Sequence, residues 1–321
     1  MQGKAHVDAM SAFYVGIDVC KARLDVYLHP TGERIAVAND AGGWRHLRRR
    51  LNDLTVELVV MEATSKYHRA IHRQLDGAGI RVAVVNPLRA RLFAEACGAL
   101  AKTDAIDARM LALMGVQLDP AVTPAPSLQA EAIEELVRAR SSAVDERVAI
   151  ANRRDITVSA FLRAELARRI KTLETHIHRL EVEIARLIAA DSMMAARYAI
   201  LRSIPGIGSV SATTLVAGLE ELGRLDGRQI AALAGLAPFA SDSGPTFGHR
   251  RIRAGRAHLR RPLYMAALSA IRSNPDLKRF HQRLTENGKP PKVAITAVMR
   301  KLLVLANSLI AQNRKWTTVP A

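Results

Sequence analysis

Asp104 and Asp107 lie three residues apart within residues 103–115, a segment of helical character. Residues at positions i and i+3 are neighbours on a helix surface, and like charges there repel each other. Such a pair either belongs to a solvated helix face or binds a cation between its two carboxylates. The other acidic residues of the chain help to choose between these two interpretations.

Two more acids stand at the ends of strand-like segments. Asp18 ends the first apolar run of the chain, and Glu62 directly follows the run VELVVM of residues 56–61. A buried strand rarely carries a carboxylate unless the charge is paired or coordinated. Asp25, in contrast, alternates with apolar neighbours, which predicts a solvent-facing position.

These acids come from a first strand, a fourth strand and a later helix, which is the layout of a ribonuclease-H-like nuclease site. Two Mg²⁺ ions in such a site activate the attacking oxygen and stabilise the leaving oxygen. Mg²⁺ prefers oxygen ligands, which explains the use of carboxylates rather than cysteine or histidine. The sequence therefore predicts a metal site formed by Asp18, Glu62, Asp104 and Asp107.

Periodicity predicts the elements that must position these acids. Alternating and apolar runs predict strands at 13–28 (two strands), 33–38, 56–61 and 81–85, and helices at 40–52, 67–78, 88–97 and 103–115. Three antiparallel strands followed by alternating strands and helices indicate an α/β fold with a mixed sheet layered with helices.

The middle of the chain is helical. Residues 118–127 contain three prolines and indicate a linker, whereas residues 128–190 contain neither proline nor glycine. Aliphatic residues from Leu162 to Ile184 recur in steps of three and four, which approximates a heptad seam. This pattern fits either a helical hairpin within one chain or a coiled coil that joins two chains.

The charge of the chain indicates a polyanionic partner. The net charge is +17, and its distribution is uneven, since residues 1–125 carry 16 basic and 13 acidic side chains whereas residues 199–321 carry 19 and 6. A basic region of this kind is typical of nucleic-acid binding. We therefore expect three regions: residues 1–120 with the acids, residues 121–198 with the linker and long helices, and a basic region at 199–321.

Two motifs in the basic region fit contacts with phosphate. Gly206 and Gly208 indicate a tight turn between two helices, and the backbone N–H groups of such a turn suit a phosphate oxygen. This turn resembles the helix-hairpin-helix motif, which binds the DNA backbone without reading its sequence. Residues 234–262 form a loop region that is rich in glycine and contains six arginines: Arg250, Arg251, Arg253, Arg256, Arg260 and Arg261.

The chain resembles a known family. The segments VGIDVCKARLDVYL, VVMEATSKYHRAIHRQL, VNPLRARLFAEACG and KTDAIDARMLA, in this order, resemble the N-terminal DEDD domain of insertion-sequence 110 family transposases. That domain is similar to the Holliday-junction resolvase RuvC. The segments LRSIPGIGSVSATTLVAGL and LAGLAPFASDSGPTFGHRRIRAGRAHLRRPLYMAAL resemble the C-terminal transposase domain of the same family.

The resemblance implies a mechanism and partners. It implies that Asp18, Glu62, Asp104 and Asp107 form the metal-binding tetrad, with Mg²⁺ or Mn²⁺ as the ion. It also implies a nucleophilic serine that forms a covalent link to DNA, and this serine is Ser243 or, as the alternative, Ser241. A structured bridge RNA that pairs with donor and target DNA is a further implied partner, and we expect a homo-oligomer, either a dimer or a tetramer.

Two other functions use the same residues. A RuvC-like nuclease that cuts Holliday junctions would use the acids and water and would need no serine. A nucleic-acid-binding protein without enzymatic activity would need only the basic region, and the intact acid tetrad argues against it. Cys20 and Cys97 show no metal-like or disulfide-like spacing, and the chain lacks a signal-peptide pattern and a long apolar run. We therefore expect a cytoplasmic protein, and the resemblance implies a bacterial, nucleoid-associated one.

Overall fold

The computed structural model of the chain describes residues 12–99, 104–239 and 250–317. Internal contacts divide the chain into two compact units, Met1–Ser127 (unit 1) and Leu128–Ala321 (unit 2). The predicted linker ends at the boundary between them. The finer division into residues 1–120, 121–198 and 199–321 stays a prediction.

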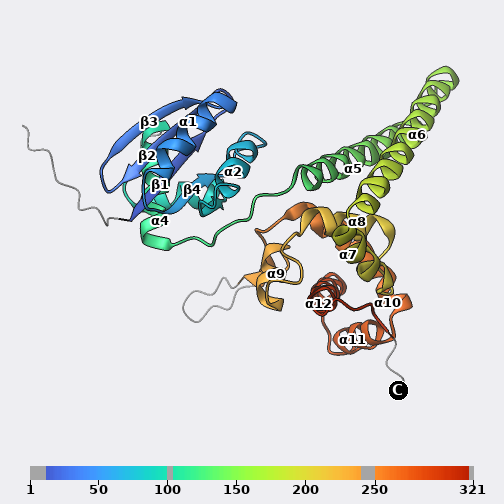
Figure 1. Ribbon diagram of the computed structural model, residues 1–321. Helices are drawn as coiled ribbons and strands as arrows, with labels where there is room; N and C mark the ends of the chain where they lie inside the picture. Colours follow the sequence, from blue (N-terminus) through green and yellow to red (C-terminus); the bar gives the residue numbers. More distant parts are fainter. Residues whose placement is uncertain (1–11, 100–103, 240–249, 318–321) are drawn as a thin grey trace, which may run out of the picture. The chain divides into compact units, whose positions relative to one another are not determined.

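Unit 1 is built on a five-stranded mixed sheet with the order β3-β2-β1-β4-β5 (Figure 1). Its strands are β1 (Phe13–Val19), β2 (Arg23–His29), β3 (Glu33–Ala38), β4 (Val56–Glu62) and β5 (Val82–Val85). The first three strands run antiparallel, and β4 and β5 run parallel to β1. This arrangement agrees with a ribonuclease-H-like domain, and the predicted strands are confirmed to within about two residues.

The two faces of the sheet are buried by different helices. One face carries β-strand residues such as Val15, Ile17 and Met61, which form a core with residues of α1 (Ala41–Asn52) and α2 (Arg69–Asp76). The other face carries Leu58 and Val60, which pack with residues of α3 (Pro87–Ala96) and α4 (Asp104–Leu118). We call this second side the α4 face.

Gly16 brings α4 close to the sheet. A Cβ atom at this position would lie 1.9 Å from the carbonyl oxygen of Ala108 and 2.5 Å from the backbone nitrogen of Ala112. Only a residue without a side chain allows this approach of helix backbone to strand backbone. The glycine in the middle of β1 therefore fixes where α4 crosses the strand.

The segment after α4 runs along the edge of the sheet. The backbone nitrogen of Thr123 donates to the carbonyl oxygen of Val82 (2.7 Å), and the Thr123 hydroxyl accepts from the backbone nitrogen of Val84 (3.2 Å). The carbonyl oxygen of Thr123 also lies 2.8 Å from Nε2 of the buried His72. The predicted linker thus begins as a strap that satisfies polar groups on the open edge of β5.

Unit 2 begins with a long antiparallel helical hairpin, formed by α5 (Leu128–Asp155) and α6 (Ala160–Ala190) (Figure 1). Ion pairs Arg140–Glu181 (2.7 Å) and Arg147–Glu174 (3.6 Å) join the two helices. The heptad-like pattern from Leu162 to Ile184 fitted either a hairpin within one chain or a coiled coil between two chains. In the structure, α6 packs against α5 of the same chain as a hairpin. At its turn the apolar residues Ile156, Val158 and Phe161 are 82%, 95% and 75% exposed.

The rest of unit 2 is a helical domain with its own aliphatic core. It contains α7 (Ser192–Ser203), α8 (Ser209–Gly218), α9 (Gly227–Leu233), a 3-10 turn η1 (Ala257–Leu259), α10 (Arg260–Ser273), α11 (Pro275–Glu286) and α12 (Pro291–Ala311). Two short strands, β6 (Pro238–Phe239) and β7 (Arg251–Ile252), pair antiparallel. Helix α12 is long and apolar enough to cross a membrane by length and composition, but Val298, Leu302 and Ala306 place it in the core of this domain.

Candidate functional site

The register between β1 and β4 brings two of the predicted acids together. Gly16 pairs with Val60 and Ile17 with Met61 in a parallel ladder. One residue further along both strands, this register makes Asp18 and Glu62 neighbours. Their backbones lie on adjacent strands, which are about 4.8 Å apart. Both lie on the α4 face, because side chains alternate along a strand and Gly16 and Val60 both face α4.

The first turn of α4 lies at the same edge of the sheet. Gly115 of α4 lies over Tyr14 and Val60, and Ala108 lies over Gly16, so the helix runs antiparallel to β1. Moving two residues up β1 from Gly16 covers about 6.6 Å, which equals about four residues of helix. The residues of α4 that come beside Asp18 are therefore those at its start, where Asp104 and Asp107 stand.

The structure thus brings Asp18, Glu62 and Asp107 to one edge of the sheet. The three side chains are half-buried, whereas the side chain of Asp104 lies outside the described residues and only its backbone is placed, as the first residue of α4. Within the part of the chain that the structure describes, no three acidic, histidine or cysteine side chains are close enough to hold a metal ion. The donor set nevertheless fits a hard divalent cation, since carboxylates are the ligands that Mg²⁺ prefers.

Asn39 connects the two segments that follow these acids. Its Nδ2 atom donates to the carbonyl oxygen of Cys20 (2.9 Å), just after β1, and to that of Tyr67 (3.2 Å), in the segment after β4. Trp44 Nε1 donates to Asn39 Oδ1 (2.8 Å), and because an indole nitrogen is only a donor, this bond fixes the orientation of the amide. We call this arrangement the Asn39 clamp. Sequence reasoning missed it, since asparagine before a helix normally indicates a turn or cap.

Asp25 differs from the sequence-based expectation. It is only 8% exposed, rather than solvent-facing, and it lies directly opposite Asp18 in the β1–β2 register. Arg23, two residues earlier on the same strand face, forms an ion pair with the Asp25 carboxylate through Nε (3.0 Å) and Nη2. The alternation of apolar and polar residues correctly predicted that Asp25 lies on the opposite face from Leu24 and Val26. The prediction that this face is exposed was wrong, because α4 covers this part of β2.

The predicted glycine turn joins α7 and α8. Gly206 has φ +102°, and a Cβ there would lie 2.5 Å from the Cα of Ala270 in α10, so packing against that helix requires this glycine. Gly208 is the N-cap residue of α8, without a side-chain cap, and nothing lies within 4 Å of the position of its missing Cβ. The open N-terminus of α8 is therefore the part of the turn that a phosphate can approach; the helix-hairpin-helix assignment stays a prediction.

Arg256, Arg260 and Arg261 form hydrogen bonds or ion pairs within the protein. Arg256 donates to both carboxylate oxygens of Glu221 (2.6 and 2.8 Å) and to the carbonyl oxygen of Gly218 (2.8 Å). Arg260 donates to the carbonyl oxygen of Ala254, and Arg261 pairs with Asp145 of the hairpin. These contacts give the three side chains a structural role, and their predicted contact with nucleic acid remains untested.

The other three arginines lie near the predicted serine loop. Arg250 and Arg251 are exposed at one end of residues 240–249, and the guanidinium of Arg253 lies 5.0 Å from the ring centre of Phe239, at the other end. Ser241 and Ser243 lie outside the described residues. Pairing of β6 with β7 places Phe239, which precedes residues 240–249, opposite Arg251, which follows them. Exposed arginines therefore lie beside both flanking positions.

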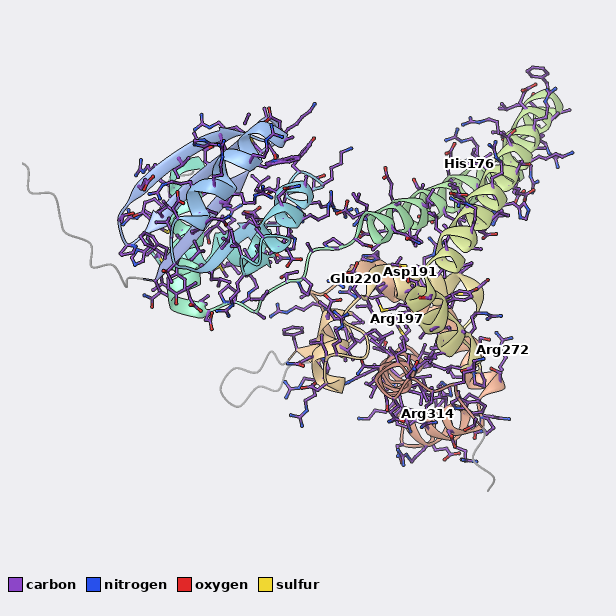
Figure 2. The ribbon with its side chains drawn as sticks, in the orientation of Figure 1. His176, Asp191, Arg197, Glu220, Arg272 and Arg314 are labelled. Atoms are coloured by element: carbon purple, nitrogen blue, oxygen red, sulfur yellow. The ribbon has the colours of Figure 1, made fainter. Side chains whose placement is uncertain are left out.

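A half-buried group of charged residues includes Arg197 and Glu220, which are labelled in Figure 2. Arg197 donates to the carbonyl oxygens of Leu219 (3.1 Å) and Glu220 (3.2 Å). Burial raises the pKa of the Glu220 carboxyl. Burial also lowers the pKa of His258, and the positive charge of Arg138 adds to this effect. The hydrogen bonds of Arg197 join α7 to the residues that follow α8, and the group involves no predicted catalytic residue.

Comparison with known proteins identifies the family. The sequence model of one protein family, the DEDD transposases of IS110 elements, matches residues 15–162. A second family model, that of the transposase IS116/IS110/IS902 family, matches residues 198–282. The chain belongs to the IS110 family of transposases. The two matched ranges contain the acid-bearing sheet and the glycine turn with the serine loop, so both parts of the predicted site lie in segments that define the family.

Individual relatives agree with this assignment. The pilin gene-inverting protein of Moraxella bovis is 27% identical over 317 residues, which cover 95% of this chain and 98% of the relative. The corresponding protein of Moraxella lacunata is equally similar over the same lengths. A 42 kDa protein of insertion element IS900 from Mycobacterium paratuberculosis is 29% identical over 150 residues, which cover 46% of this chain and 36% of the relative.

Proposed function

We propose that this IS110-family transposase is a recombinase that cuts and rejoins DNA strands with a Mg²⁺-dependent acid site and a serine nucleophile. The convergence of Asp18, Glu62 and the start of α4 at one sheet edge carries the proposal. The similarity to two pilin gene-inverting proteins of Moraxella supports DNA inversion or transposition as the overall reaction.

The acids would hold the metal and place the phosphate. Asp18, Glu62, Asp104 and Asp107 supply carboxylate oxygens, with Asp18 and Glu62 on rigid strands and the other two on the first turn of a helix. Bound Mg²⁺ would stabilise the negative charge that develops on the phosphate being attacked. Strands and helices hold such groups more accurately than loops do, which suits a reaction that needs aligned oxygens.

Ser243 would form the covalent intermediate, with Ser241 as the alternative. Its Oγ atom forms a bond to phosphorus while one P–O bond of the DNA backbone breaks, and its proton is lost as the leaving sugar oxygen gains one. Attack by the hydroxyl of the exchanged strand then reverses the step and rejoins the DNA without hydrolysis. A serine hydroxyl needs activation, and the exposed Arg250 and Arg251 beside the loop can neutralise the phosphate.

The remaining features would bind nucleic acid and assemble the complex. Phosphate contacts at the start of α8 and at the exposed arginines position DNA but read no sequence. A bridge RNA that pairs with donor and target DNA would supply specificity in the manner of other RNA-guided systems. The exposed apolar turn of the hairpin, with Ile156, Val158 and Phe161, supports a dimer or tetramer.

A covalent-adduct assay tests the mechanism. The protein is expressed together with its native flanking non-coding DNA, mixed with labelled donor and target DNA and Mg²⁺, and denatured. We expect labelled DNA attached to the wild type, and none attached to Ser243→Ala or Asp107→Asn. Cleavage by Ser243→Ala without an adduct, after the same check of Ser241→Ala, would instead establish a RuvC-like nuclease that uses water. DNA binding without cleavage by any form would establish a non-enzymatic protein.

Mixing the two inactive variants tests how the site is assembled. If the acids and the serine act in different chains of an oligomer, Ser243→Ala and Asp107→Asn chains together restore part of the adduct. If both act within one chain, the mixture stays inactive.

A further inference from the structure

A pocket lies beside the acid edge on the α4 face. It has a volume of about 160 Å³ and is lined by side chains of β2 and β3 and by Ala108 of α4. Asp25, in its wall, is directly opposite Asp18 in the sheet register, and adjacent strands are about 4.8 Å apart. Ala108 is the neighbour of Asp107 in α4. The pocket therefore borders the acid edge on the β2 side.

Arg23 and Arg34 line the pocket, with Ala36 between them. Arg23 is opposite Ala38 and Arg34 is opposite Tyr27 in the β2–β3 register, so the two arginines stand at different ends of the pocket. Both point to the α4 face, because their chain neighbours Leu24 and Ile35 belong to the core on the other face. The side chains of the exposed Ala36 and Ala38 are small, so they leave space above this part of the sheet.

The charges of the pocket differ from those of the acid edge. The side chain of Arg23 is 58% exposed and forms an ion pair with Asp25, so this arginine compensates the carboxylate in the pocket wall. Arg34 is exposed and forms no ion pair with any residue that the structure describes. Arg34 therefore adds a positive charge at its end of the pocket, beside an Asp25 carboxylate that Arg23 already compensates. Guanidinium groups bind phosphate oxygens through paired hydrogen bonds.

We propose that this pocket binds a phosphate of the DNA strand that is being cut, one or two nucleotides from the cleaved bond. The proposal rests on the proposed function, in that the acid edge is taken as the place of cleavage. The pocket borders the acid edge, where the proposed cleavage takes place, so its occupant is the strand being cut rather than the guide RNA. Arg34 is a positioning residue and is not one of the proposed metal ligands.

The test compares Arg34→Gln with Arg49→Gln. Arg49 is an exposed arginine at the end of α1, on the opposite face of the sheet, so the two variants lose the same charge. Binding of the full chain to a fluorescent DNA duplex of arbitrary sequence is measured without Mg²⁺ over a range of salt concentrations. Each lost phosphate contact lowers the slope of log K against log salt by about 0.9.

We expect this loss of slope for Arg34→Gln and not for Arg49→Gln, with unchanged melting temperatures for both. Equal slopes for the two variants would overturn the proposal, as would an effect on binding of a structured RNA with none on DNA.

The proposed function fails independently of this pocket. If the wild type forms no covalent adduct but Arg34→Gln still lowers the slope, the pocket is a DNA-binding site in a protein that does not cut by serine. If the adduct forms and Arg34→Gln behaves as Arg49→Gln does, the recombinase stands and the pocket assignment is wrong.

Discussion

The two units of this transposase gather charge in opposite ways. In unit 1, carboxylates that are far apart in the sequence come together because strand register brings them to one edge of the sheet. Asp18 and Glu62 are an example. In unit 2, arginines that are close in the sequence separate, since Arg256 turns to Glu221 and Arg261 to Asp145. A run of arginines in the sequence therefore indicates a binding region. The fold decides which of these arginines pair with acidic side chains and which are exposed to a ligand.

The difference also separates rigid from adaptable parts of the site. The acids stand on a sheet whose two faces are buried by apolar residues. Of the exposed arginines near residues 240–249, Arg251 stands on the two-residue strand β7, and Arg250 and Arg253 flank that strand. Rigid groups suit metal binding, and groups near a loop suit contact with a long, variable polyanion. The following predictions test this contrast, from the largest expected effect to the smallest.

Loss of one acid should abolish catalysis and leave the fold intact. We expect Asp107→Asn to lower the rate of strand cleavage by about 1,000-fold, because it removes a ligand for a cation that contributes several kcal/mol to transition-state stabilisation. Asp76→Asn, which changes an exposed carboxylate of the same unit, is the control and should keep its activity. Comparable rates for the two variants would remove Asp107 from the acid site.

Gly16 should be required for the position of α4. Replacement by alanine places a Cβ inside the backbone of α4, and we expect the free energy of unfolding to fall by about 3 kcal/mol or more. Denaturant titration measures the change. Gly208→Ala in unit 2 meets open space and should change stability by less than about 1 kcal/mol. A tolerated Gly16→Ala would mean that α4 does not lie on β1 as described.

Arg256 and Arg251 should behave differently although they are five residues apart. Arg256→Ala breaks a half-buried pair with Glu221, so we expect a loss of about 1–2 kcal/mol of stability. Arg251→Ala should leave stability unchanged and lower the salt slope of DNA binding by about 0.9, since its side chain is exposed beside the serine loop. Thermal melting and DNA titration of both variants check this, and the reverse pattern would contradict the assignment of roles.

The Asn39 clamp should affect how tightly the acid site binds its metal ion, although Asn39 is not one of the predicted ligands. We expect Asn39→Ala to raise the Mg²⁺ concentration needed for half-maximal cleavage by about tenfold, as loss of supporting hydrogen bonds does at other metal sites. Stabilisation of the protein by Mn²⁺, measured as a shift in melting temperature, should weaken in parallel. Asn86→Ala, which removes only the N-cap of α3, is the control, and an equal change in both variants would show a general loss of stability.

Acid should destabilise unit 2 through His258. Burial lowers its pKa in the folded state, so the folded protein binds fewer protons than the unfolded chain. The favourable contribution of the neutral ring is complete above the unfolded pKa of about 6.5 and is lost as the pH falls through the lowered folded value. We expect a lower melting temperature at pH 5.5 than at pH 7.5 and a smaller difference for His258→Asn. Burial also lowers the pKa of His68, so some dependence should remain in the variant.

The sequence by itself determined the elements of unit 1 and the order of its acids. Alternation over residues such as 33–38 and apolar runs such as 56–61 are local properties, and the strands formed where these patterns occur. The family was also recognisable, because its segments keep their order along the chain. Charge distribution indicated which third of the chain carries the basic surface.

Only the tertiary structure decided which polar groups meet. Burial of Asp25 depends on α4, which begins 79 residues later, and the Asn39 clamp joins Cys20 and Tyr67, which lie 19 and 28 residues away. Arg261 finds its partner 116 residues away. The sequence pattern also fitted a hairpin and an intermolecular coiled coil equally well, since both bury the same aliphatic seam. Periodicity states which face of an element is buried, but the covering partner is chosen by contacts across the whole fold.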